Sequence, residues 1–93
     1  MDPALLQELH GAIEEIGRRR FATAEAIAQA KHKARASLIV FGQQVLPVTV
    51  REATSVLANR LDEFEGARPA LGWEPLLHAL QLLELEIAGV TGR

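Results

Sequence analysis

Hydrophobic positions along this chain recur at the spacing of helices. The clearest stretch is residues 21–45, which contains no proline and one glycine, Gly42. At 100° per residue, one side of this stretch carries Ala26, Ile27, Ala30, Ala34, Ser37, Leu38, Phe41 and Val45. Alanine is the strongest helix former, so local propensity agrees with the pattern. We therefore predict a long helix over residues 21–45 at the centre of a small bundle.

An earlier stripe of apolar residues predicts a helix over residues 3–17. The stripe consists of Leu5, Leu9, Ala12, Ile13 and Ile16. Asp2 before Pro3 favours a helix start, because the carboxylate can accept from free backbone N–H groups and proline lacks an N–H that would have no partner there. Gly17 follows the stripe and is expected to form a left-handed C-cap. A continuous helix to Phe41 is the alternative, since no proline interrupts that stretch.

A third helix is predicted over residues 50–65. Pro47 disfavours helical backbone at the residue before it and so ends the preceding helix. Thr49 and Glu52 have the spacing of a capping box, with threonine as the N-cap. The apolar face that follows is formed by Val50, Ala53, Leu57, Leu61 and Phe64, with Val56 beside them. Gly66 is predicted to close this helix.

The fourth predicted helix covers residues 74–89 and follows a loop over residues 67–72. Its core stripe consists of Trp73, Leu76, Leu80, Leu83, Ile87 and Val90. Leu82 and Leu85 lie on the opposite side and flank His78. Since one wall of a monomeric bundle cannot bury both sides, we predict that these three residues contact a partner. The alternatives are two leucines exposed singly, or a central helix covered on both sides within one chain.

These elements predict an all-α, four-helix bundle with short connections, formed by residues 1–93 as one domain. Residues 38–50 can also be interpreted as two strands, but no other segment has a strand pattern to pair with them. A chain of 93 residues buries only about 60–70% of its unfolded surface. Oligomerisation could therefore complete the core.

Net charge is −2, but the charges are segregated along the chain. Residues 1–17 and 52–93 each carry −4, whereas residues 18–51 carry +6. The predicted basic surface comprises Arg18, Arg19, Arg20, Lys31, Lys33 and Arg35. Such a surface can bind phosphates or an acidic protein, or it can pair with the acidic helices of its own chain. The acidic pI of about 5.9 and the lack of interleaved aromatic residues argue against nucleic acid as the partner.

The chain offers little catalytic chemistry. It has no cysteine, no tyrosine and no glycine-rich phosphate-binding pattern, and Ser37 and Ser55 have no histidine near them in sequence. The pairs His10–Glu14 and Glu74–His78 are spaced i,i+4, unlike the Glu-x-x-His spacing of carboxylate metal sites in bundles. We therefore expect no enzyme activity, no metal and no cofactor.

The residues favour a cytoplasmic protein–protein interaction module, a small adaptor that forms a homo-oligomer or binds another helical protein. The alternatives are a nucleic-acid-associated factor that uses residues 18–35, and a small chaperone or immunity-type protein that sequesters one client. The first residues lack the pattern of a secretory signal, and the longest apolar run, Leu38–Phe41, is far too short to span a bilayer. We expect no membrane partner, and export by a route without a signal stays open.

Overall fold

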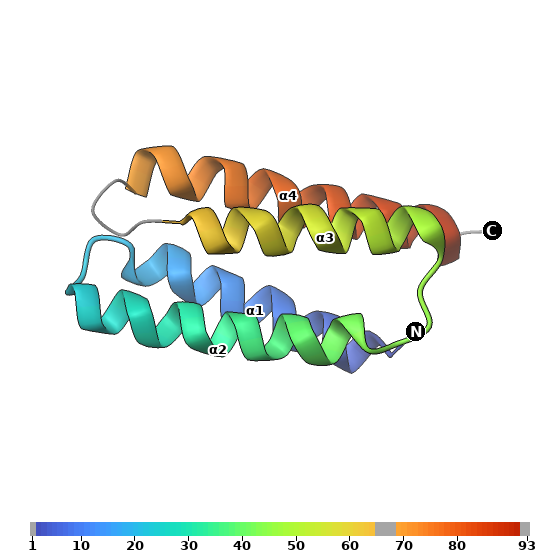
Figure 1. Cartoon of the computed structure of the whole chain (residues 1–93), viewed down its shortest axis with the longest axis horizontal. Coiled ribbons are helices and arrows are strands. Elements are labelled where there is room, and N and C mark those ends of the chain that lie inside the picture. Colours follow the sequence, from blue (N-terminus) through green and yellow to red (C-terminus); the bar gives the residue numbers. More distant parts are fainter. Residues whose placement is uncertain (1, 65–68, 92–93) are drawn as a thin grey trace.

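The computed structural model describes residues 2–64 and 69–91, and these form a four-helix bundle with no strand among them. The helices are α1 (Pro3–Arg19), α2 (Ala24–Gly42), α3 (Val48–Glu63) and α4 (Pro69–Thr91). Figure 1 shows two helical hairpins, α1–α2 and α3–α4, stacked along their length. Each helix packs most closely on its hairpin partner, and α1 meets α4 least. The all-α prediction is confirmed, and the strand interpretation of residues 38–50 is wrong.

The start of α1 is as predicted, but its end differs. The Asp2 carboxylate accepts a hydrogen bond from the N–H of Ala4 at 2.9 Å, and proline occupies the first turn. The helix continues through Gly17 to Arg19, and no described glycine has positive φ. The predicted left-handed cap at Gly17 is therefore wrong.

Gly17 instead allows α4 to approach α1. The residue is buried, and a Cβ atom added to it would lie 2.4 Å from both Cζ2 and Cη2 of Trp73. That separation is well inside van der Waals contact, so only glycine leaves room for the indole ring. A glycine that resembles a helix terminator in the sequence thus sets the distance between two helices.

The connections at the two ends of α2 differ from those predicted from the sequence. A turn separates α1 from α2, and the hydroxyl of Thr23 accepts from the N–H of Ala26 at 3.2 Å, so α2 begins at Ala24 rather than at residue 21. The alternative of one continuous helix is therefore wrong. Because α2 ends at Gly42, Val45 lies outside it and is 95% exposed, whereas Leu46 is 5% exposed and takes the place in the core.

The predicted capping box at Thr49 does not form. Pro47 is the N-cap of α3, no side chain caps the helix, and the Pro47 carbonyl accepts from the N–H of Arg51 at 2.9 Å. The proline ring fixes φ at a value suited to the turn, and burial of Leu46 anchors the entering chain. Thr49 consequently lies in the first turn of α3. The predicted stop at Gly66 falls outside the described residues.

The fourth helix begins at Pro69, five residues before the predicted start at residue 74. The predicted loop is therefore wrong for residues 69–72, while residues 67 and 68 lie outside the described part. Proline is well suited to a first helical position, but Pro75 lies inside α4 and removes one backbone hydrogen bond. Burial of Leu76, together with packing of Trp73 on the core, offsets that cost.

One continuous core joins the two hairpins. Its largest fully buried side chains are Phe41, Leu9, Ile13, Ile16, Leu57, Leu61, Leu76, Leu80, Leu83 and Val50. All four predicted stripes contribute to this set, so the 3.6-residue periodicity identified the core faces correctly. Val45, Val56 and Val90 are exceptions, since they are 95%, 41% and 39% exposed.

The contact between Gly17 and Trp73 can be tested with a pair of alanine substitutions in α1. Gly17→Ala should lower the free energy of unfolding by about 1–3 kcal/mol, because the new methyl group overlaps the indole ring. Gly11→Ala is the matched control, since nothing lies within 4 Å of its added Cβ. It should raise stability by about 0.5–1 kcal/mol through helix propensity. Urea denaturation measures both, and a stabilising Gly17→Ala would contradict the close approach.

Candidate functional site

The outer face of α4 carries the residues predicted to contact a partner. Leu82 is 42% exposed, Leu85 is 67% exposed, and His78 is also exposed. Leu80 and Leu83, on the opposite side of the same helix, are at most 1% exposed. The two apolar sides of α4 thus have different environments. The alternative in which one chain covers both sides of α4 is wrong.

A shallow groove of about 520 Å³ runs beside Leu82, between α3 and α4. It is lined by Val56, Arg60, Glu74, Pro75, His78, Ala79 and Leu82. Val56 is exposed beside Leu82 in this groove, although the sequence analysis placed it next to the core face of its helix. Its angular position on α3, well away from Leu57 and Leu61, could have indicated that it is exposed. We call the surface formed by Val56, His78, Leu82 and Leu85 the α3–α4 face.

Five of the six predicted basic residues contact groups of their own chain. Lys31 Nζ donates to the carbonyl oxygens of Asp62 at 3.3 Å and Phe64 at 3.0 Å. Arg35 forms an ion pair with the Asp62 carboxylate. These two cations of α2 therefore lie at the C-terminal end of α3, where the free carbonyls carry partial negative charge.

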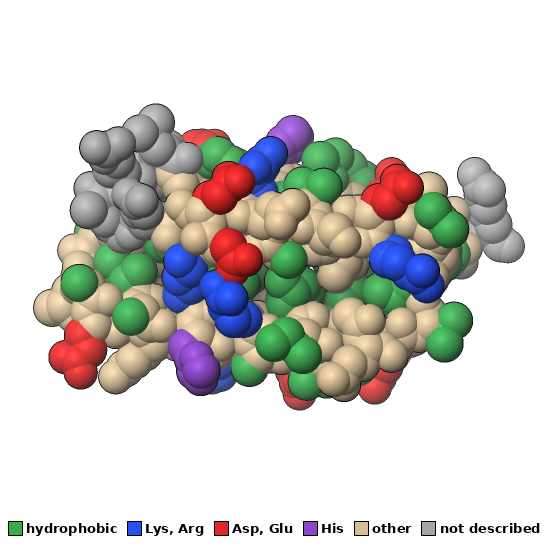
Figure 2. Space-filling view, viewed as in Figure 1, with side chains coloured by type: hydrophobic (Ala, Val, Ile, Leu, Met, Phe, Trp, Pro, Cys, Tyr) green, Lys and Arg blue, Asp and Glu red, His purple; other side chains and the backbone are tan. Residues whose placement is uncertain are grey.

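The three arginines at the end of α1 also contact groups of their own chain. Arg18 and Arg19 both hydrogen-bond the carboxylate of Glu15, and together they lower its pKa. Arg20 donates to the Gly17 carbonyl at 2.6 Å, and its guanidinium lies 4.7 Å from the ring centre of Phe21 and 5.4 Å from that of Trp73. These arginines therefore have partners within their own chain, as Lys31 and Arg35 of α2 have. Figure 2 shows cations and carboxylates mixed over the α2–α3 side.

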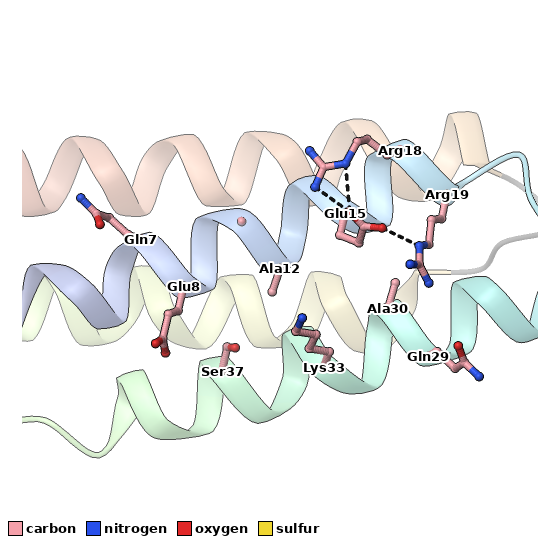
Figure 3. A pocket seen from close by; sticks show the side chains of 11 residues that line it. Gln7, Glu8, Ala12, Glu15, Arg18, Arg19, Gln29, Ala30, Lys33 and Ser37 are labelled. Atoms are coloured by element: carbon pink, nitrogen blue, oxygen red, sulfur yellow. Dashed lines mark hydrogen bonds and ion pairs between the residues drawn. The ribbon is translucent and has the colours of Figure 1, made fainter.

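Lys33 is exposed and lines a wide cleft of about 780 Å³ between α1 and α2. Figure 3 shows Glu8, Glu15, Arg18, Arg19 and Lys33 along this cleft, together with glutamines and small residues. Both signs of charge are present and Ser37 is the only hydroxyl in the lining. Its three cations, Arg18, Arg19 and Lys33, stand against two carboxylates, so the lining carries a net charge of only +1.

His10 links α1 to α4. Its Nε2 lies 2.5 Å from Glu14 Oε1, and its Nδ1 lies 2.5 Å from Glu84 Oε1. The hydrogen bond to Glu84 is the main cause that raises the pKa of His10, and Glu14 adds to it. The two carboxylates approach opposite ring nitrogens. Among the described residues, no group of three potential ligands is placed to hold a metal ion.

Comparison with protein-family models, curated proteins and solved structures found no match. Within the described part of the chain, no helix combines the length and the apolar character needed to cross a membrane. The α3–α4 face is therefore interpreted from its own geometry alone.

The bridge at His10 predicts a pH-dependent contribution to stability. Since its pKa in the folded protein lies above the ordinary 6.5, the stabilisation is fully present below pH 6.5 and is lost as pH rises through the raised value. His10→Gln should therefore destabilise the protein more at pH 5.5 than at pH 8.5, as measured by urea denaturation. Glu84→Gln should give the same dependence, and the double variant should lose less than the two single losses combined. A pH-independent effect would contradict the bridge.

The internal pairing of the basic residues predicts weak binding to nucleic acid. Fluorescence anisotropy with a duplex and a single-stranded probe should show little or no binding at about physiological salt, and none as salt rises. Tight binding at high salt that is lost on changing Arg20, Lys31 and Arg35 to glutamine would contradict this expectation.

Proposed function

We propose that this chain is a helix-mediated protein–protein interaction module that docks through its α3–α4 face. The observation that carries the proposal is the apolar outer side of α4, where Leu82 and Leu85 stay exposed while the opposite side fills the core. Val56 extends the apolar surface onto α3. Three neighbouring aliphatic side chains on adjacent helices form a patch of the kind that partner helices cover.

The expected affinity is moderate. Full burial of an exposed valine or leucine side chain is worth about 1.5–3 kcal/mol, and here each side chain is already partly buried. Association costs about 4–15 kcal/mol of translational and rotational freedom. A partner must therefore add apolar groups of its own, so a helical surface with a similar patch is the best match.

The alternative of a nucleic-acid-associated factor has less support, because Arg18, Arg19, Lys31 and Arg35 already have acidic or carbonyl partners. A chaperone or immunity-type protein that sequesters one client would use the same α3–α4 face. These versions differ in the partner, and not in the residues that bind it.

The double variant Leu82→Glu, Leu85→Glu tests the proposal. It should abolish association while circular dichroism shows unchanged helicity, because both side chains lie outside the core. The matched control is Ile39→Glu with Val40→Glu on α2, where the native side chains are 57% and 45% exposed. It adds the same charge away from the face and should leave association intact. Association is measured by sedimentation velocity and by pull-down from an extract of the protein's own cells.

Two results would count against the proposal. One is a wild-type protein that associates neither with itself nor with any partner. The other is a Leu82→Glu, Leu85→Glu variant that unfolds as Leu83→Glu should, which would mean that the outer side chains support the fold itself.

A further inference from the structure

We infer that His10 is a proton-operated latch that holds the first half of α1 on the last part of α4. When the ring loses its proton, the first half of α1 (residues 3–10) opens locally while the rest of the bundle stays folded. The inference concerns this local opening, in contrast to unfolding of the whole chain, and it is independent of the proposed docking function.

The latch consists of one imidazole ring between two carboxylates on different helices. His10 Nδ1 lies 2.5 Å from Glu84 Oε1 on α4, and His10 Nε2 lies 2.5 Å from Glu14 Oε1 on α1. Ionised carboxylates only accept hydrogen bonds, so both ring nitrogens must carry a proton for both bonds to form. The neutral ring has one N–H. It can therefore donate to only one carboxylate, and without the positive charge that strengthens the bond.

No other cation replaces His10 as the partner of Glu84. The groove beside the ring is lined by Leu6, Gln7, His10, Gly11 and Glu84, so neither α2 nor α3 adds a charged side chain to it. Glu14 also lies 3.8 Å from Arg18 and keeps this cation of its own helix when His10 is neutral. In the described part of the chain, the Glu84 carboxylate has His10 as its one partner. Deprotonation therefore weakens the link between the two helices.

The latch lies where the packing of α1 on α4 becomes thin. The start of α1 and the end of α4 lie at the same end of the bundle (Figure 1), and α1 meets α4 least among the helices that touch. After His10, the side chains of Ile13 and Ile16 are fully buried. Before it, Leu9 is the one buried side chain of residues 3–10. Opening this half of α1 therefore exposes less apolar surface than opening the other half, which favours a local opening.

The opposite side of the bundle is held by contacts of another kind. Between α2 and α3, Arg35 forms an ion pair with Asp62, and Lys31 donates to the carbonyl oxygen of Phe64. An arginine guanidinium keeps its charge over the whole pH range in which histidine titrates. Loss of the His10 proton therefore weakens the α1–α4 side and leaves these contacts as they are.

The direction of the switch follows from the surroundings of the ring. The hydrogen bond to Glu84 is the main cause that raises the pKa of His10 above 6.5. The latch is therefore fully closed below pH 6.5 and is released as pH rises through the raised value, so that opening releases a proton. The two side chains are 42% and 37% exposed, and solvent screens their pairing. We therefore expect a change of about two- to fivefold in the opening equilibrium.

Native-state hydrogen exchange of the full chain, followed by NMR, tests the latch. The backbone N–H of Leu9 reports on the first half of α1, and that of Leu57 reports on the core of α3. After correction for the intrinsic exchange rate, the opening equilibrium at Leu9 should rise about two- to fivefold between pH 5.5 and pH 8.5. This opening should be insensitive to low concentrations of urea. Exchange at Leu57, which requires global unfolding, should instead increase steeply with urea.

Three variants separate the latch from the other contacts of the ring. His10→Gln and Glu84→Gln each remove one end of the link to α4, so the pH-dependent rise at Leu9 should disappear in both. Glu14→Gln is the matched control, because it removes a carboxylate from the same ring without removing the link to α4. The rise should remain in this variant, with its midpoint at a lower pH, since Glu14 also raises the pKa of His10.

Three results would overturn the inference. The first is exchange at Leu9 with the same opening equilibrium and the same urea dependence as at Leu57, which would mean that the bridge acts only on global stability. The second is a local opening at Leu9 that is unchanged between pH 5.5 and pH 8.5. The third is a rise at Leu9 that persists in His10→Gln, which would assign the proton to another group.

Discussion

The constraint on which this structure depends is that α4 carries apolar side chains on two opposite sides, and the core of a four-helix bundle can bury only one of them. Leu76, Leu80 and Leu83 fill the space between the hairpins and are at most 1% exposed. Leu82 and Leu85 stay outside as a consequence of the same helix geometry. The position of α4 in the core therefore determines the surface that the bundle offers to a partner.

Polar and aromatic contacts then set how the two hairpins meet. α1 and α4 have few contacts with each other. Among them, the Trp73 ring packs against Gly17, and the Glu84 carboxylate hydrogen-bonds the His10 ring. Between α2 and α3, Lys31 and Arg35 attach to the end of α3. Cations and carboxylates that are separated along the sequence therefore lie side by side in the fold, because the basic segment packs against acidic neighbours. The α3–α4 face also carries both signs of charge, since Arg60 and Glu74 line the same groove and Arg60 pairs with Glu63.

Periodicity predicted most of the fold, because each stripe of apolar residues repeats every three to four positions and only one side of each helix can be buried. The helix ends were harder to predict. Thr49 and Pro47 both favour a helix start, and only the turn anchored by Leu46 decides between them. Gly17 has the sequence signal of a terminator, and its role depends on Trp73, which lies 56 positions away. The exposure of Leu82 and Leu85 followed from their angle, and the angle of Val56 on α3 also pointed away from the core. That Val56 joins Leu82 in one groove follows only from the placement of α3 beside α4.

The central claim is that the outer side of α4 and its neighbour α3 form a surface that docks a partner. Sedimentation velocity of the fluorescently labelled wild-type protein and of the Leu82→Glu, Leu85→Glu variant, each alone and in an extract of the protein's own cells, tests it most directly. The account predicts that the wild-type protein sediments above its monomer mass of 10.1 kDa in at least one of these samples and that the variant stays at the monomer mass in both. A wild-type protein that stays at the monomer mass in both samples would contradict it, and so would a folded variant that associates as the wild type does.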